Sequence, residues 1–65
     1  MKVESVLDYF GPRFNCNAEF RLVDQNQPYF ITDGTEFSDD EFLLNGYVQE
    51  ISIKDAHTIE FVFKA

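Results

Sequence analysis

The segment DGTEFSDDEFLLNG, residues 33–46, lies between two halves of the chain that both have the residue pattern of β-strands. It begins with Asp33-Gly34, a strong turn pair, and it ends with Asn45-Gly46, which is typical of helix C-termini. Between them, Ser38-Asp39-Asp40-Glu41 has the form of a capping box, in which the serine hydroxyl accepts from the last amide. The segment therefore predicts a short helix over about residues 39–44 that joins two hairpins.

Two further features of this segment bear on its structure. Phe37 and Phe42 flank the box at the positions of a hydrophobic staple, which fixes the angle at which the chain enters a helix. The Asp33-Gly34 pair also allows a rival interpretation, in which residues 29–32 fold back onto residues 35–37 as a hairpin. The sequence leaves both interpretations open.

The residues before this segment predict a helix and then a hairpin. A helix is expected over residues 3–10, because its apolar residues recur at the spacing of one helical face, and Gly11-Pro12 ends it. Residues 18–23 alternate with the period of a strand. Residues 29–32 supply a second, β-prone strand after a polar turn.

The residues after the segment predict a second hairpin. Its first strand covers residues 47–53, and a bulge near Gln49-Glu50 would bring Val48 to the same face as the two later isoleucines of this strand. A turn at residues 54–57 leads to residues 58–64, which alternate well between apolar and polar side chains.

These elements predict one α+β domain over residues 1–65, with an N-terminal helix on an antiparallel sheet of about four strands in the order α-β-β-(short helix)-β-β. A core built from so short a chain is marginal, so that dimerisation would add stability. The expected core comprises one helix face and the inward strand positions: Val3, Val6, Leu7, Phe10, Ala18, Phe20, Leu22, Ile51, Ile53, Ile59, Phe61 and Phe63, with Phe37 and Phe42 added from the middle segment.

The composition of the chain indicates a soluble, cytoplasmic protein. Its single cysteine, Cys16, excludes an intramolecular disulfide and any need for an oxidising compartment. Charged residues interrupt the first positions, unlike a signal peptide, and no apolar run approaches the roughly 20 residues that span a bilayer.

The net charge of −7 restricts the kinds of partner. Direct binding to nucleic acid or to an anionic membrane requires a basic surface, so we expect neither. Basic proteins, metal cations and simple solubility remain as explanations of the charge. The densest carboxylates form a candidate acidic interaction surface: Asp33, Glu36, Asp39 and Asp40.

A metal site in this acidic segment is not expected. Calcium loops of the EF-hand type require oxygen donors at alternate positions and a glycine at the sixth. Counted from Asp33, the fifth position is Phe37 and the sixth is Ser38, so the pattern fails. No metal or other cofactor is therefore predicted.

The sequence also lacks a catalytic constellation. His57 falls in a predicted turn, and the only cation beside Cys16 in the local sequence is Arg13, so neither residue fits a known nucleophile signature. We therefore expect no enzyme activity.

A second candidate surface is apolar. One helix covers one side of a four-stranded sheet, and some apolar residues miss the inward parity. If they are exposed together, they form an apolar interaction face, because such patches mark interfaces. Its members are Val23, Phe30 and Val62, with Tyr29 beside them.

In the order of its elements the chain resembles small acidic proteins of bacterial phages and conjugative elements. The features that carry the resemblance are a lead helix ending in Tyr9-Phe10-Gly11, a hairpin ending near Asp33-Gly34, a short acidic turn, and a closing hairpin with Val48, Ile51, Ile53 and Ile59. The resemblance implies a bacterial or phage cytoplasmic setting and an accessory role, and it transfers no functional residue.

Two hypotheses of function follow. In the first, the chain is a small acidic, non-enzymatic accessory or protein-interaction module, which binds another protein or a second copy of itself through a sheet face or edge. In the second, it is an acidic mimic of nucleic acid that inhibits a host DNA- or RNA-binding protein. The mimic requires the carboxylates to form one continuous surface with Glu19, Glu50 or Glu60.

Overall fold

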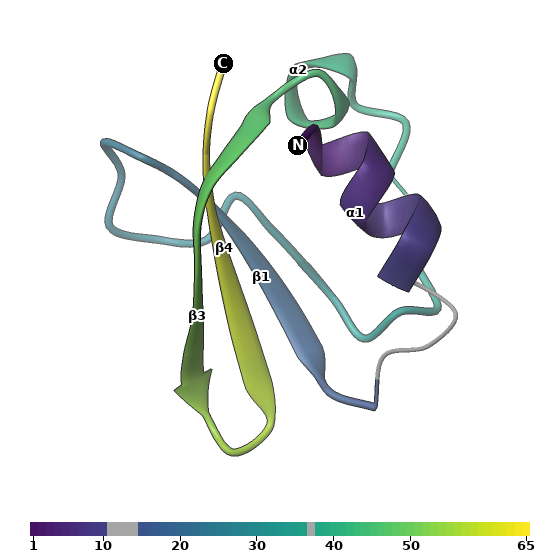
Figure 1. The fold of residues 1–65 in the computed structure, drawn as a ribbon, viewed down its shortest axis with the longest axis vertical. Helices are drawn as coiled ribbons and strands as arrows, with labels where there is room; N and C mark the ends of the chain where they lie inside the picture. The colour runs from purple at the N-terminus through teal and green to yellow at the C-terminus, as the bar shows by residue number, and fades with distance from the viewer. Residues whose placement is uncertain (11–14, 37) are drawn as a thin grey trace.

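The computed structural model describes residues 1–10, 15–36 and 38–65, without the side chain of Phe10. In these residues the helices and strands follow the predicted order (Figure 1). They are α1 (Val3–Phe10), β1 (Asn17–Leu22), β2 (Phe30–Thr32), α2 (Glu41–Leu44), β3 (Tyr47–Asp55) and β4 (Thr58–Lys64). The α+β class, with an N-terminal helix on a sheet of four described strands, is confirmed.

The sheet has the strand order β2-β1-β4-β3. Both predicted hairpins are antiparallel, but the central strands β1 and β4 pair in parallel, from Asn17 opposite Thr58 to Leu22 opposite Phe63. The prediction of a wholly antiparallel sheet is therefore wrong in its centre. The reason is the segment between β2 and β3, which returns to the end of the sheet where β2 began (Figure 1), so that β3 runs down and β4 runs up beside β1. Residue types predict that this segment turns, but they do not say how far it travels.

The core lies between the helices and one face of the sheet. From α1, the buried side chains are Val3, Val6 and Leu7, as the helical spacing predicts. They form one cluster with Ala18 and Phe20 of β1, Leu43 of α2, and Phe61 and Phe63 of β4. At its centre the rings of Phe20 and Phe61 are stacked, with centroids 4.9 Å apart. The predicted core positions of Phe37 and of the Phe10 side chain, and the helix stop at Gly11-Pro12, lie outside the described residues.

Two predicted core residues on β3 are exposed. Ile51 and Ile53 pair with Phe61 and Ile59, so they point to the helix side of the sheet, as predicted. Their side chains are nevertheless 52% and 81% exposed. In Figure 1 the lower part of β3 lies away from α1, because this eight-residue helix starts beside the upper end of β3 and then runs away from it.

The predicted bulge on β3 is confirmed. Val48 pairs with Phe63 and Glu50 pairs with Val62, which leaves Gln49 as the extra residue. Val48 therefore packs, partly buried, against the core.

The capping box predicted at Ser38 is not formed. Helix α2 begins at Glu41, and its N-cap is Asp40, whose carboxylate accepts from the amide of Phe42 at 3.0 Å. The hydroxyl of Ser38 instead accepts from the amide of Asp40 at 3.1 Å. Both serine and aspartate can cap a helix. Here Asp40 is the N-cap, and the hydroxyl of Tyr29 fixes the position of its carboxylate by donating a second hydrogen bond to it.

The ends of the middle segment behave as predicted turns. Gly34 has a φ of 96°, which favours glycine, and its amide donates to the hydroxyl of Thr32. That hydroxyl donates to the carbonyl of Glu36, so residues 33–36 form a compact turn. Among the described residues of the rival hairpin, 35 and 36 are not in a strand.

At the other end, Asn45 is the C-cap of α2, as the stop signal predicts. A Cβ added at Gly46 would lie 2.5 Å from Cδ2 of Phe63, so this position also needs glycine to admit the ring.

The placement of the core predicts different costs for one substitution at two sites. Val6→Ala should lower the free energy of unfolding by about 1–3 kcal/mol, because it removes two methyl groups from a buried side chain. The matched change Val23→Ala, at a side chain that is 50% exposed, should cost less than about 0.5 kcal/mol. Urea denaturation followed by circular dichroism measures both. Equal costs at the two sites would contradict the placement of α1.

Candidate functional site

The acidic segment is mainly architectural. The carboxylate of Asp33 accepts from both the amide and the hydroxyl of Thr35, and the hydroxyl bond is the main reason that the pKa of Asp33 is lowered. Asp40 caps α2. Asp33 follows the end of β2, whereas Asp40 is bonded to Tyr29, directly before β2 begins. The predicted acidic surface is therefore divided between the two ends of this strand.

An aromatic cluster of Tyr29, Phe42 and Phe63 lies beside Asp40. The ring of Tyr29 lies 5.6 Å from that of Phe42 and 5.9 Å from that of Phe63, between centroids. The Tyr29 hydroxyl donates to Oδ2 of Asp40. This bond lowers the pKa of Asp40 and raises the pKa of Tyr29. Phe42, predicted to belong to the core, is 45% exposed and instead borders this end of the molecule.

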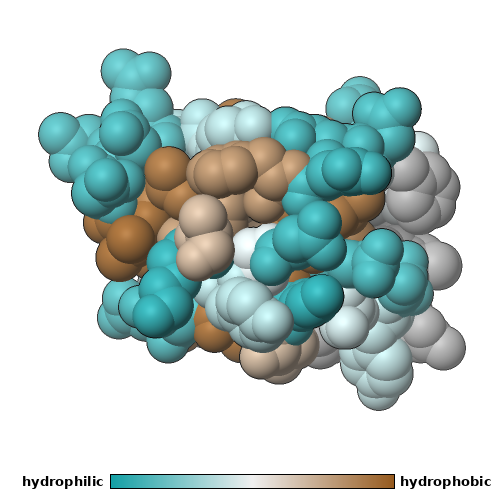
Figure 2. Space-filling view, turned by 90° about the horizontal axis from the view of Figure 1, so that it is seen from above, coloured by the Kyte–Doolittle hydropathy of each residue, from teal (hydrophilic) through white to brown (hydrophobic). Residues whose placement is uncertain are grey.

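Figure 2 views the molecule from the end where Figure 1 places both termini and α2, and hydrophobic surface lies there between hydrophilic regions. The rings of Tyr29 and Phe42 are about half exposed. No pocket opens among the described residues, so the cluster offers an exposed apolar surface without a cavity.

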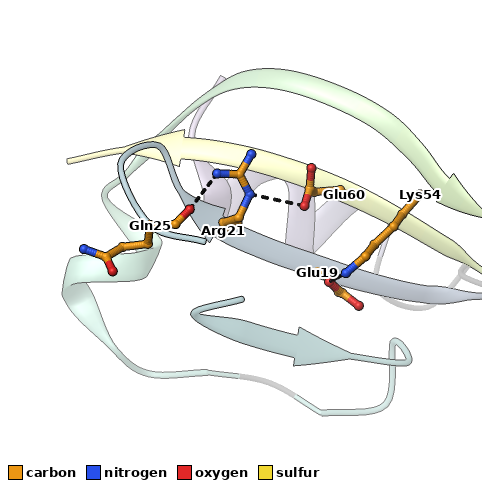
Figure 3. Close-up of polar contacts among 5 residues, drawn as sticks. All are labelled: Glu19, Arg21, Gln25, Lys54 and Glu60. Carbon is orange, nitrogen blue, oxygen red and sulfur yellow. Dashed lines mark hydrogen bonds and ion pairs between the residues drawn. The ribbon is translucent and has the colours of Figure 1, made fainter. Parts of the chain in front are cut away.

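The face of the sheet opposite the helices is mainly polar, and we call it the open face. One exposed apolar residue, Ile31, lies on it opposite Glu19. Lys54 of β3 donates to Glu19 of β1 at 2.8 Å, across the intervening strand β4 (Figure 3). Arg21 binds Glu60 at 3.2 Å, and its Nη1 also donates to the carbonyl of Gln25 at 2.7 Å. The bond to Glu19 raises the pKa of Lys54. No helix of the described residues covers this face, and the two ion pairs lie across it instead.

The three residues of the predicted apolar face are not exposed together. Val62 does lie on the open face, but it is 4% exposed, because the register places it between Arg21 and Glu50. Phe30 faces the other way and packs against the core, with its ring 6.2 Å from that of Phe20. Only Val23 is exposed, beyond the end of β1. The condition for this interaction face is therefore not met.

The outer edge of β3 is the feature that the sequence analysis missed. At its upper end the chain start pairs with it: Lys2 bridges to Tyr47, and the amide of Val48 donates to the carbonyl of Met1 at 2.8 Å. Along residues 49–55, no strand of the described chain pairs with this edge. We call these seven residues the free edge. Two residues of the free edge, Ile51 and Ile53, are exposed although they were predicted to be buried. Their alternation along the strand shows correctly which face of the sheet they point to, but it does not show how far the helix covers that face.

A backbone hydrogen bond joins the turn that carries His57 to the residue after Cys16. The amide of Asn17 donates to the carbonyl of His57 at 2.7 Å, so the residue after Cys16 is bonded to the turn between β3 and β4. The His57 side chain is exposed, as expected for a turn. In the part of the chain that the structure describes, no three acidic, histidine or cysteine side chains are grouped to hold a metal ion.

Comparison with protein-family models, with curated proteins and with solved structures finds no match to this chain. Neither described helix has the length and apolar character that a membrane span requires.

The bond between Tyr29 and Asp40 predicts a change in acid titration. A carboxylate whose pKa is lowered by folding contributes stability above its unfolded pKa, near about 4, and loses that contribution as the pH falls through the folded pKa. Tyr29→Phe should therefore raise the pKa of Asp40, lower stability at pH 7, and weaken the loss of stability below about pH 4.

Carboxyl-carbon NMR titration measures the pKa, and urea denaturation at pH 7 and pH 3 measures the stability. Tyr47→Phe is the matched control, since it removes the hydroxyl of another half-exposed tyrosine. Identical titration of Asp40 in the wild type and in Tyr29→Phe would contradict the assignment.

Proposed function

We propose that this chain is a small, non-enzymatic protein-interaction module that binds its partner by strand addition at the free edge of β3. The observation that carries the proposal is the pair of exposed isoleucines on a strand whose backbone groups are unpaired on one side, in residues 49–55. Strand addition uses such an edge for affinity and the alternating side chains for specificity.

The other surfaces support this choice by contrast. The open face is crossed by the ion pairs of Arg21 with Glu60 and of Lys54 with Glu19, so these four charged side chains already have partners within the chain. The other edge strand, β2, has three residues, and short edges pair poorly with another chain. A free edge of seven residues with two exposed isoleucines is the surface best suited to bind a protein.

The acidic mimic has weaker support. Glu19 and Glu60 are bound to cations of the same chain, and Asp33 and Asp40 lie at the two ends of β2. A mimic needs its carboxylates free and continuous, so the charge of −7 is better assigned to solubility. Failure to compete with DNA for a basic DNA-binding protein at low salt would remove this second hypothesis.

A bacterial or phage cytoplasmic setting is part of the proposal. It is supported by the resemblance to small acidic proteins of mobile elements. A single cysteine that has no disulfide partner in the chain also suits a reducing compartment.

The proposal predicts a site-specific contact. A photo-crosslinking phenylalanine analogue in place of Ile53 should give one adduct of defined mass in cells that express the protein, and Ile51→Lys in the same chain should abolish it. The analogue in place of Gln27, which is exposed in the loop between β1 and β2, is the matched control. The absence of an adduct from position 53, or equal adducts from both positions, would refute strand addition.

A further inference from the structure

The free edge has a defined length and defined ends, which limit the register that a partner strand can adopt. Residues 1 and 2 occupy the outer side of Tyr47 and Val48, and β3 ends at Asp55. Among the described residues, 49–55 are therefore left for a partner strand, and their midpoint is Ser52. If the same edge of a second copy paired with it in the antiparallel direction, the two copies would be related by a two-fold axis at Ser52.

The sequence of the free edge, Gln-Glu-Ile-Ser-Ile-Lys-Asp, is complementary to itself about this midpoint. In a two-fold antiparallel pair, Ile51 lies opposite Ile53 of the second copy. Glu50 lies opposite its Lys54, which is the extra residue at the register shift between Ile53 and Asp55. The isoleucines share the helix side, and the charged residues share the open face, where Lys54 meets Glu19 and Glu50 pairs with Val62. Apolar residues thus meet apolar residues, and opposite charges meet on the other face.

Neighbouring registers lose these matches. A shift that centres the axis on Ile53 puts Ile51 opposite Asp55 and Ser52 opposite Lys54. A shift that centres it on Ile51 puts Lys54 opposite Val48, whose outer side is already bonded to Met1. Of these three registers, only the one centred on Ser52 uses the whole free edge.

We propose that the partner at the free edge is a second copy of this chain, paired through β3 about a two-fold axis at Ser52. This inference rests on the proposed function, since it names the partner of the same edge. The two four-stranded sheets become one continuous sheet, with both helix layers on the same side. Ile51 and Ile53 then meet the same residues of the second copy across the axis, where α1 does not reach.

The net charge of each copy opposes this association over long distances. Two chains of −7 repel one another, but at physiological salt the screening length is about 8 Å, while the charges paired across the strands are in contact. Association should therefore strengthen as salt rises from low values to about 150 mM. This direction distinguishes the dimer from an encounter driven by charge attraction.

A disulfide experiment tests the register. In a Cys16→Ser background, Ser52→Cys places two thiols opposite one another, at the separation that a cross-strand disulfide spans. Mild oxidation should give a covalent dimer. The matched variant Gln49→Cys lies on the same exposed edge, but its two thiols would be about 20 Å apart in this register, so it should remain monomeric. Equal crosslinking of the two variants would overturn the register.

A charge exchange tests the pairing in solution. Glu50→Lys and Lys54→Glu should each weaken the homodimer by about tenfold or more, because two attractive pairs become repulsive. Mixing the two variants should restore the affinity, since each supplies the charge that the other needs. Analytical ultracentrifugation at 150 mM salt measures all three, and circular dichroism checks that each variant is folded. A mixture no tighter than its components would overturn the pairing.

The outcomes separate this inference from the proposed function. If the wild type stays monomeric up to millimolar concentration while position 53 still crosslinks to a different protein, the second copy is refuted and strand addition stands. If position 53 crosslinks to nothing, both strand addition and the second copy as partner are refuted. A wild-type dimer with a Ser52→Cys disulfide and restored affinity in the mixture supports both.

Discussion

The parallel pairing of β1 with β4 is the constraint on which the rest of the structure depends. It places Phe20 against Phe61 and gives the core its stacked pair of rings. The two strands can be parallel only because the middle segment carries the chain back along the molecule before β3 begins (Figure 1). Glycine at position 46 then lets this segment end against Phe63. The helices, the core and the exposed edge all follow from this one return.

Much of this architecture could be predicted from residue spacing. The apolar face of α1, the two hairpins, the bulge at Gln49 and the C-terminal stop of α2 depend on local geometry, which period and turn chemistry report directly. The N-cap of α2 was predicted two residues too early. Ser38 and Asp40 are both good caps, and the hydroxyl of Tyr29, eleven residues from Asp40, decides between them.

The exposed surfaces were harder to predict, because exposure depends on distances between elements. Ile53 has inward parity and is exposed, whereas Val62 has outward parity and is buried. A strand at the edge of a sheet extends beyond a short helix, and a strand at the centre is shielded by its neighbours on either side. The same reasoning explains why an apolar surface was expected on the open face, whereas exposed apolar side chains lie at the edge of β3 and in the cluster of Tyr29 and Phe42.

The position of β4 also governs the order in which this chain can fold. Its residues are the last in the sequence to enter the sheet, yet they form its centre and hold β1 and β3 in place. The two hairpins can be joined only when residues 17–22 pair with residues 58–63, which lie about forty positions later in the sequence. During synthesis the first hairpin leaves the ribosome with no sheet to join, and contacts between such distant residues slow the search for the native state. The sheet can therefore be completed only after β4 has been synthesised.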